Sequence, residues 1–195
     1  MTGILARKTE TLKVYVAGKV SPNSVFGTQN WRDGFCHELS RKSGFQIFNL
    51  DPTKVPKGFK LNENDSKLIF GRDCFMIKSS DLVIVYLTND ISVGGSQEML
   101  IAKYYNKPLI GIAPSEGKFN RQEKEISGII YKNWIHPFVN MPCDSVVESI
   151  NEAAEFVKEF FANPSPKVKG LSVVDEALAY YKDNYYDVDE VLRID

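Results

Sequence analysis

The segment Asp81–Leu87 (DLVIVYL) decides the fold, because every side chain after its aspartate is apolar. Such a run is typical of a strand buried on both faces, as in a parallel sheet that helices cover on each side. Lys13–Ala17, Phe45–Leu50 and Leu109–Ala113 are further apolar segments of strand length. We therefore predict that these four segments are strands of one sheet.

Segments with the apolar spacing of helices separate these strands. Trp31–Lys42 is one, a second begins near Asn64 or Asp65, and a third covers Gln97–Tyr105. Strands that alternate with helices imply right-handed crossovers and a parallel sheet. We predict a fifth strand around Trp134 and Ile135, in the second half of the chain.

The C-terminal part supplies two more predicted helices. Asp144 is expected to cap an amphipathic helix, and a Pro-rich linker that begins at Asn163 follows it. We thus expect a domain over residues 1–162 and a linker with a helical tail over residues 163–195. The apolar face predicted for the tail helix consists of Leu171, Val174, Leu178 and Tyr181.

These elements together predict an α/β fold, a flavodoxin-like, doubly wound sheet of about five parallel strands with a C-terminal helical extension. In such a sheet the binding crevice lies at the carboxyl ends of the strands, beside the point where the strand order reverses. Three loops should reach it, namely residues 18–30, 50–64 and 88–96. We therefore look for function in these loops.

Composition narrows the class of protein. The chain has 195 residues, a formal net charge of -1 and two histidines. Neither a nucleic-acid partner nor a membrane partner is favoured by such a charge, and no apolar run approaches the roughly 20 residues of a membrane span. Met1–Lys13 lacks the apolar core of a secretory signal, and Cys36, Cys74 and Cys143 are too scattered for a disulfide framework. We expect a cytoplasmic protein with reduced thiols and no histidine-based metal site.

The usual phosphate-binding and hydrolase motifs are missing. The chain has no P-loop and no G-x-S-x-G elbow, and Gly18 stands alone after the first strand. The segment Gly94–Glu98 (GGSQE) stands out instead, because two glycines let the backbone approach a ligand closely. Glu98 would fall in the first turn of a helix, where the helix dipole keeps a carboxylate ionised, as a nucleophile requires. A first-turn glutamate that only stabilises the helix end fits this position equally well.

Short pieces of the chain, taken in order, match one known enzyme family. They are Tyr15–Gly18 on the first strand, Asp73 in the second helix, Asp81 before the third strand, Gly94–Ala102, and Lys107 with Pro108. In this order and spacing, from Lys13 to Ala113, the chain resembles the nucleoside 2-deoxyribosyltransferases. The 5'-nucleotide N-hydrolases belong to the same superfamily and share its fold and nucleophile.

The resemblance implies roles for three residues. Glu98 would attack the anomeric carbon of a nucleoside and form a glycosyl-enzyme intermediate, as in a retaining glycosidase. Tyr15 would hydrogen-bond Glu98 and orient it. Asp73 matches the carboxylate near the departing base, where it could transfer a proton. Without the resemblance, Tyr15 and Asp73 would be interpreted as a half-buried aromatic and a surface acid.

The chain departs from the transferases in one place. They carry an acidic residue five or six positions before the nucleophile, where this chain has Val93 and Ser92. A serine six positions before the nucleophile resembles the nucleotide N-hydrolases instead. Arg32, at the start of the first helix, would suit a 5'-phosphate, and a solvated surface arginine is the alternative. The expected substrate-binding residues are Gly18, Arg32, Ser92, Gly94, Gly95 and Ser96.

We therefore expect an enzyme that cleaves the N-glycosidic bond of a (deoxy)nucleoside and transfers the sugar to another base. A 5'-monophosphate N-hydrolase that releases free base is the first alternative, and a non-catalytic nucleotide-binding module is the second. The expected partners are a nucleoside or nucleotide, a free base and further copies of the chain in a homo-oligomer. No cofactor or metal is expected, because the leaving group needs only proton transfer.

Overall fold

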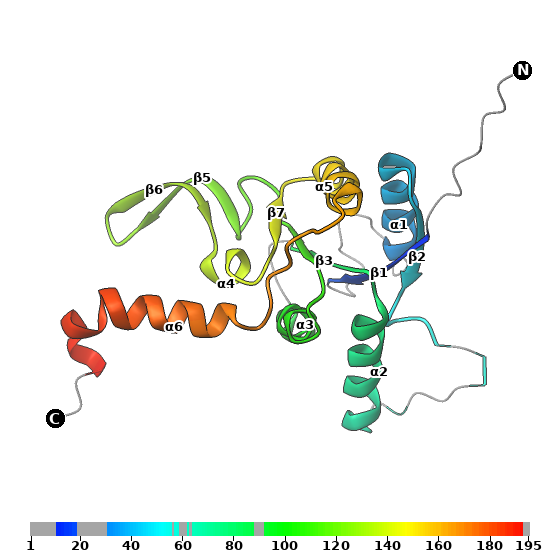
Figure 1. Cartoon of the computed structure of the whole chain (residues 1–195), viewed down its shortest axis with the longest axis horizontal. Coiled ribbons are helices and arrows are strands. Elements are labelled where there is room, and N and C mark those ends of the chain that lie inside the picture. Colours follow the sequence, from blue (N-terminus) through cyan, green and yellow to red (C-terminus); the bar gives the residue numbers. More distant parts are fainter. Residues whose placement is uncertain are drawn as a thin grey trace, which may run out of the picture.

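The structure is a computed structural model that describes residues 11–18, 31–55, 57–58, 62, 64–87 and 92–192. Its central sheet has five parallel strands in the order β2-β1-β3-β4-β7 (Figure 1). They are β1 (Thr11–Ala17), β2 (Gln46–Leu50), β3 (Leu82–Tyr86), β4 (Leu109–Ile112) and β7 (Ser145–Val147). This is the 2-1-3-4-5 order of a flavodoxin-like sheet. The predicted fold class is confirmed.

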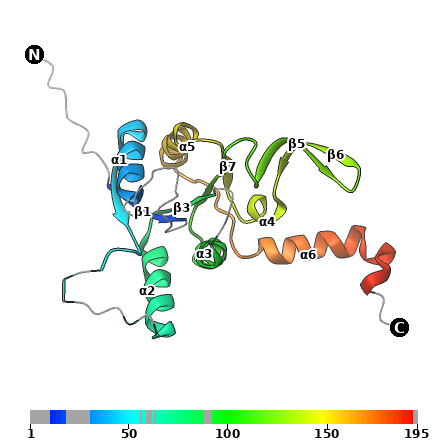
Figure 2. The ribbon, with the colours of Figure 1, turned by 180° about the vertical axis from the view of Figure 1, so that it is seen from behind.

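Helices cover both faces of the sheet (Figures 1 and 2). On one face, α1 (Trp31–Ser43) packs against α5 (Ile150–Ala162), and on the other, α2 (Ser66–Ser79) packs against α3 (Val93–Tyr104). Alternate residues of β1 point to opposite faces, as the pleat requires. Val14 and Val16 join the core under α1 and α5, whereas Tyr15 joins the core under α2 and α3. The alternation therefore aims Tyr15 at the two helices that carry Asp73 and Glu98.

The fifth strand of the sheet is not where the sequence analysis predicted it. Trp134 and Ile135 belong to β6 (Ile129–Ile135), which pairs with β5 (Asn120–Ile126) in a separate antiparallel hairpin. Ser127 and Gly128, both with positive φ, form its two-residue turn, a conformation that matches the twist of paired strands. The strand of the sheet is β7, which is only three residues long and too short for a periodicity signal.

Asp144 does not cap the following helix. Helix α5 begins at Ile150, and its N-cap is Ser149, whose hydroxyl accepts a hydrogen bond from the Glu152 backbone N–H. Asp144 lies before β7 and accepts hydrogen bonds from Lys103 Nζ (2.5 Å) and from the Leu109 and Lys169 backbone N–H groups. The carboxylate therefore joins α3, β4 and the segment that leads to the C-terminus.

The C-terminal helix is present, but most of its predicted apolar face is not packed within the chain. Helix α6 (Val173–Asn184) extends away from the sheet, on the side of the β5–β6 hairpin (Figure 1). Leu171, Val174 and Leu178 are exposed, and Val173 is the buried residue of the helix. A short helix, α4 (Pro137–Asn140), and two 3-10 turns, η1 (Tyr186–Val188) and η2 (Glu190–Leu192), complete the described elements. Within these described segments, none of the helices is long and apolar enough to cross a membrane.

Candidate active site

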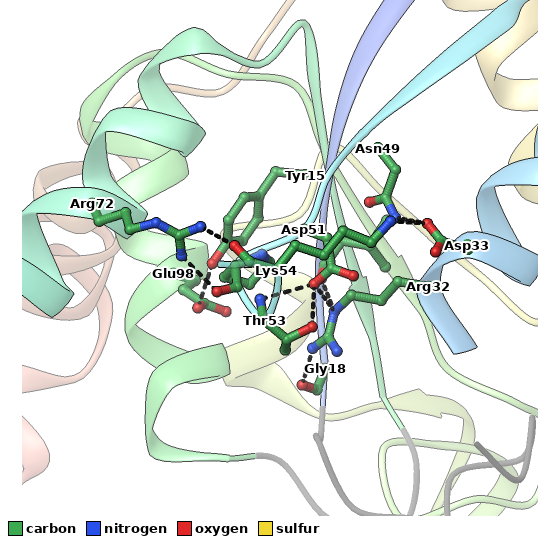
Figure 3. A network of polar contacts seen from close by, with 12 residues as sticks. Tyr15, Gly18, Arg32, Asp33, Asn49, Asp51, Thr53, Lys54, Arg72 and Glu98 are labelled. Carbon is green, nitrogen blue, oxygen red and sulfur yellow. Dashed lines mark hydrogen bonds and ion pairs between the residues drawn. The ribbon is translucent and has the colours of Figure 1, made fainter. Parts of the chain in front are cut away.

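A tyrosine and a glutamate that lie 83 positions apart in the sequence meet beneath α3. The Tyr15 hydroxyl donates a 2.7 Å hydrogen bond to Glu98 Oε1 (Figure 3). Tyr15 lies towards the carboxyl end of β1, where it pairs with Leu50 and Val83 of the two neighbouring strands, and it is fully buried. The bond engages one oxygen of the carboxylate, so that the tyrosine orients the glutamate.

Glu98 lies deeper in its helix than the sequence analysis predicted. Helix α3 begins at Val93 rather than Gln97, so that Glu98 is its sixth residue and not part of its first turn. The reason is the Ser92 hydroxyl, which accepts a hydrogen bond from the Gly95 N–H and caps the helix before the two glycines. The helix dipole is strongest in the first turn, so the surroundings of Glu98 dominate its ionisation.

These surroundings raise the pKa of Glu98. Burial is the largest cause, and the nearby Asp73 carboxylate adds to it, whereas the Tyr15 hydrogen bond and the Arg32 charge oppose it. The pKa of Asp73, on α2, is also raised by burial, while Arg72 and Arg32 lower it. Burial together with the charge of Glu98 raises the pKa of Tyr15, which therefore stays a hydrogen-bond donor. Two carboxyl groups with raised pKa values and one neutral phenol thus form the centre of the candidate site.

The small residues that precede Glu98 bond within their own helix. The Ser96 hydroxyl donates to the Val93 carbonyl, and Ser92 is the helix cap. Gly95 is buried, and a Cβ at Gly94 would lie 3.8 Å from Glu98 Oε1, an ordinary contact distance. All four therefore lie within six residues of Glu98 at the start of α3, and their part in substrate binding stays a prediction.

Arg32 is placed differently from an exposed phosphate ligand. Its side chain is 2% exposed, and its guanidinium donates from Nε to the Val16 carbonyl (2.9 Å) and from Nη2 to the Gly18 carbonyl (2.7 Å). The guanidinium carbon also lies 4.6 Å from the ring centroid of Trp31. The same indole leaves no room for a side chain at Gly18, because a Cβ there would lie 2.9 Å from it. These contacts give Arg32 and Gly18 a structural role, since both residues pack at the end of β1.

Sequence reasoning missed two charged residues beside the site, which Figure 3 includes. Asp51, directly after β2, is buried, and its Oδ1 accepts hydrogen bonds from the backbone and hydroxyl of Thr53. Arg72, next to Asp73 on α2, donates to the carbonyls of Pro52 and Lys54 and holds that turn against the helix. The Asp-Pro-Thr sequence signals such a turn, but nothing local links it to Arg72, 20 positions away.

A separate apolar cavity of about 470 Å³ lies between α3, α4, α6 and the end of β6. His136 lines it and packs against the rings of Phe119, Trp134 and Phe138. Tyr15, Asp73 and Glu98 do not line it. Most of residues 18–30, the part 59–61 of the second predicted loop, and residues 88–91 lie outside the described residues. In the described ranges, no three His, Cys, Asp or Glu side chains are grouped as a metal site.

The structure is similar to that of a conserved protein from Enterococcus faecalis, with 17% sequence identity and a TM-score of 0.54. The match covers 76% of this chain and 98% of the other. The chain has the fold of that protein. No family model matches this sequence, and neither does any curated protein.

Nucleoside-processing enzymes are also among the similar structures. A 2-deoxyribosyltransferase from Bacillus psychrosaccharolyticus matches with 17% identity over 73% of this chain and 90% of its own, at a TM-score of 0.46. A CMP N-glycosidase from Clostridium botulinum matches with 13% identity over 76% of this chain and 99% of its own, at a TM-score of 0.41. Similar structures thus include both a 2-deoxyribosyltransferase and an N-glycosidase.

Proposed function

We propose that the chain is an N-glycosyl enzyme of the nucleoside 2-deoxyribosyltransferase family, with Glu98 as the nucleophile. The observation that carries the proposal is the hydrogen bond from the buried Tyr15 hydroxyl to Glu98 Oε1. A carboxylate held in this way keeps Oε2 for attack, and a surface glutamate that only stabilises a helix end has no need of a buried phenol partner. Asp73 beside the pair supplies the second carboxyl group that glycosyl transfer uses.

The reaction would proceed in two displacements at the anomeric carbon. Glu98 forms an ester bond to this carbon as the bond to the base nitrogen breaks, and the electron pair leaves with the base. Asp73, whose raised pKa favours carrying a proton, gives that proton to the base and takes one back from the acceptor. The nitrogen of a second base then attacks the same carbon and releases Glu98. Tyr15 stays neutral and keeps its hydrogen bond throughout.

Hydrolysis of a nucleoside 5'-monophosphate is the second candidate. It is supported by Ser92, which stands six positions before Glu98 where the transferases carry an acid. Water instead of a base would then attack the glycosyl-enzyme. The contacts of Arg32 with Val16 and Gly18 weigh against its use as the phosphate ligand. A non-catalytic nucleotide-binding module is the third candidate.

Chromatography of reaction mixtures separates these candidates. The protein is incubated with deoxynucleosides, ribonucleosides and their 5'-monophosphates, each with and without a free acceptor base. A new nucleoside that forms only with acceptor supports the transferase, and free base from monophosphates without acceptor supports the hydrolase. Glu98→Gln should lose either activity, while Glu155→Gln, on the exposed side of α5, should keep it. Binding without any product would support the binding module.

We also propose the setting in which the enzyme acts. Its partners would be a nucleoside or nucleotide, a free base and other copies of the chain. Cys36, Cys74 and Cys143 are all free, and burial raises the pKa of Cys36 and of Cys143 to about 12. Unpaired, protonated thiols fit a cytoplasmic location.

A further inference from the structure

Two elements of the chain have little packing of their own. Among the described residues, the hairpin β5–β6 pairs with no third strand, and an isolated two-stranded hairpin is at best marginally stable in water. Helix α6 is 12 residues long, and in the part of the chain that the structure describes Val173 is its only buried residue. A helix of this length depends on tertiary packing for its stability. Both elements project from the same end of the molecule, so one neighbour can cover both (Figures 1 and 2).

One face of the hairpin is apolar and exposed. Side chains of directly paired residues lie on the same face, as do residues two positions apart on a strand. The pair Ile126 and Ile129 therefore shares a face with the pair Lys124 and Tyr131. The three apolar residues of this face have exposed fractions between 42% and 57%. An antiparallel sheet normally turns such a face to a core.

Ring contacts join this face to the apolar cavity between α3, α4 and α6. The Lys124 ammonium lies 5.4 Å from the ring centroid of Trp134, and that ring contacts His136, which lines the cavity. Phe138 also lines the cavity and is 85% exposed, so the cavity opens to solvent. A cavity of about 150 Å³ already accepts a molecule of the size of benzene. This cavity, of about 470 Å³, therefore has room for two isoleucine side chains.

The two elements also carry opposite charges. Residues 173–192 contain six acidic side chains and one lysine, and Asp175 and Glu176 lie in the first turn of α6, which lines the cavity. Residues 120–135 contain three basic and two acidic side chains, with Lys124 on the apolar face. A two-fold axis that brings the hairpin of one copy to α6 of another pairs an apolar projection with an apolar cavity and basic groups with acidic ones. The surface is thus self-complementary, as a two-fold interface requires, which favours a second copy over an unrelated partner.

We propose that the hairpin β5–β6 is a dimerisation arm. In a two-fold dimer, Ile126 and Ile129 of each copy enter the cavity between α3, α4 and α6 of the other copy, and Lys124 lies beside the first turn of that α6. Each contact covers both elements that lack packing, and the symmetry repeats the contact. The inference goes beyond the proposed function and does not depend on it, because its tests measure association rather than turnover.

Sedimentation equilibrium of the full chain, over the micromolar range, measures the dimer. Ile129→Glu places a charge on the apolar face at a side chain that is exposed in the single chain, so the variant should fold. Its dimer dissociation constant should rise by about 30-fold or more, the loss expected for a central interface residue. Phe70→Glu introduces the same charge at an exposed phenylalanine of α2 and should leave the constant unchanged.

Two results of this measurement would overturn the proposal. One is an unchanged dissociation constant in folded Ile129→Glu, with folding checked by circular dichroism. The other is a wild-type chain that stays monomeric throughout the concentration range. Fluorescence of the apolar dye ANS with that monomer would then show that the cavity is open to a different apolar ligand.

Cross-linking tests which surfaces meet. Ser127→Cys at the hairpin turn and Ala177→Cys at the cavity are made separately in a Cys74→Ser background, since the other two cysteines are buried. The two variants carry different isotope labels, are mixed, and are joined by a short bismaleimide. Mass spectrometry should find links between the unlike chains. Links between like chains alone would overturn the proposed arrangement, and Lys67→Cys, on α2, in place of Ala177→Cys should give no link.

Discussion

At the scale of single residues, the proposed chemistry depends on the pair Tyr15 and Glu98. The phenol of Tyr15 is buried on the α2 and α3 side of β1, and its hydroxyl donates a hydrogen bond to Glu98 Oε1. The resemblance to a known family pointed to these two residues and to Asp73. Sequence reasoning could not find Asp51, because its charged neighbour Arg32 lies on α1, far away in the sequence. Nor could it show that Arg32 is buried rather than solvated.

Replacing Glu98 by glutamine should stop turnover and stabilise the fold at neutral pH. Turnover should fall by at least about 10³-fold, because an amide is not a nucleophile. Burial raises the pKa of Glu98, so the native state binds a proton that the unfolded chain has already released in the window between the two pKa values. The free energy of unfolding therefore falls as pH rises through that window, and it stays lower by the same amount above the window. Glutamine carries no such cost.

The measurement is thermal unfolding of both proteins at pH 5 and pH 8. Glu98→Gln should show the higher Tm at pH 8, and the difference should shrink at pH 5. A lower Tm for the variant at pH 8, or substantial remaining turnover, would contradict the assigned state and role of Glu98.

Tyr15→Phe should leave the nucleophile in place but weaken it. The variant loses a hydrogen bond to a charged group, worth about 1.5–3 kcal/mol, so kcat/KM should fall about 10- to 100-fold. Since that bond also lowers the pKa of Glu98, the acid limb of the pH profile should move to higher pH. Steady-state rates across pH measure both effects. Tyr104→Phe, at an exposed position of α3, serves as the control. An identical loss of kcat/KM in Tyr104→Phe would contradict the role of the Tyr15 hydroxyl.

At the scale of elements, the strands and helices of the sheet follow from local patterns, whereas the connections between them do not. The central strands were predictable from their apolar runs, and Asp65 caps α2 where the sequence indicated. The hairpin β5–β6 is largely exposed and carries charged pairs, such as Glu123 opposite Lys132. Such a composition does not show which sheet a strand joins. Only long-range pairing makes β7 the fifth strand.

Asp144 is expected to hold three elements together. It accepts hydrogen bonds from Lys103, which has no exposed side-chain surface, and from the backbones of Leu109 and Lys169. Asp144→Ala would leave the Lys103 ammonium buried and unpaired, at a cost of about 3–5 kcal/mol. Urea unfolding measures this loss. Glu155→Ala, which removes an exposed ion pair with Lys158, should change stability by less than about 1 kcal/mol. Equal losses of stability in the two variants would contradict the role of Asp144 in holding the three elements together.

At the scale of the whole molecule, apolar surface remains uncovered around the cavity beside α6. Phe138 is 85% exposed, and Leu100 and Val174 also line the cavity with about half of their surfaces exposed. Leu178 continues this face one turn further along α6. Contiguous exposed apolar surface of this kind marks interaction sites, and a standard interface covers about 800 Å² on each partner. A second copy of the chain is the expected partner.

Phe138→Glu should therefore lower the oligomeric state at micromolar concentrations. A charge at the centre of an apolar contact would be buried without a partner, which costs far more than a lost methyl contact. Sedimentation velocity measures the distribution of species. Phe48→Glu places the same charge at an exposed phenylalanine on the edge strand β2, away from this face, and should leave the distribution unchanged. A wild-type chain that sediments as a monomer would contradict the expectation.

The sequence by itself determined the class of fold, the four strands of apolar character and the helices between them, because these follow from local periodicity and from the burial of apolar runs. The structure showed that Ser92 caps α3, which begins at Val93, so that Glu98 lies beyond the first turn. It also decided that Arg32 is buried against Val16 and Gly18, and that β7 completes the sheet. For Arg32 and β7 the physical reason is the same, because desolvation and strand pairing depend on groups far apart in the chain, which local patterns do not contain. The Ser92 cap is a local contact with Gly95, and the spacing of apolar residues carries no signal for it.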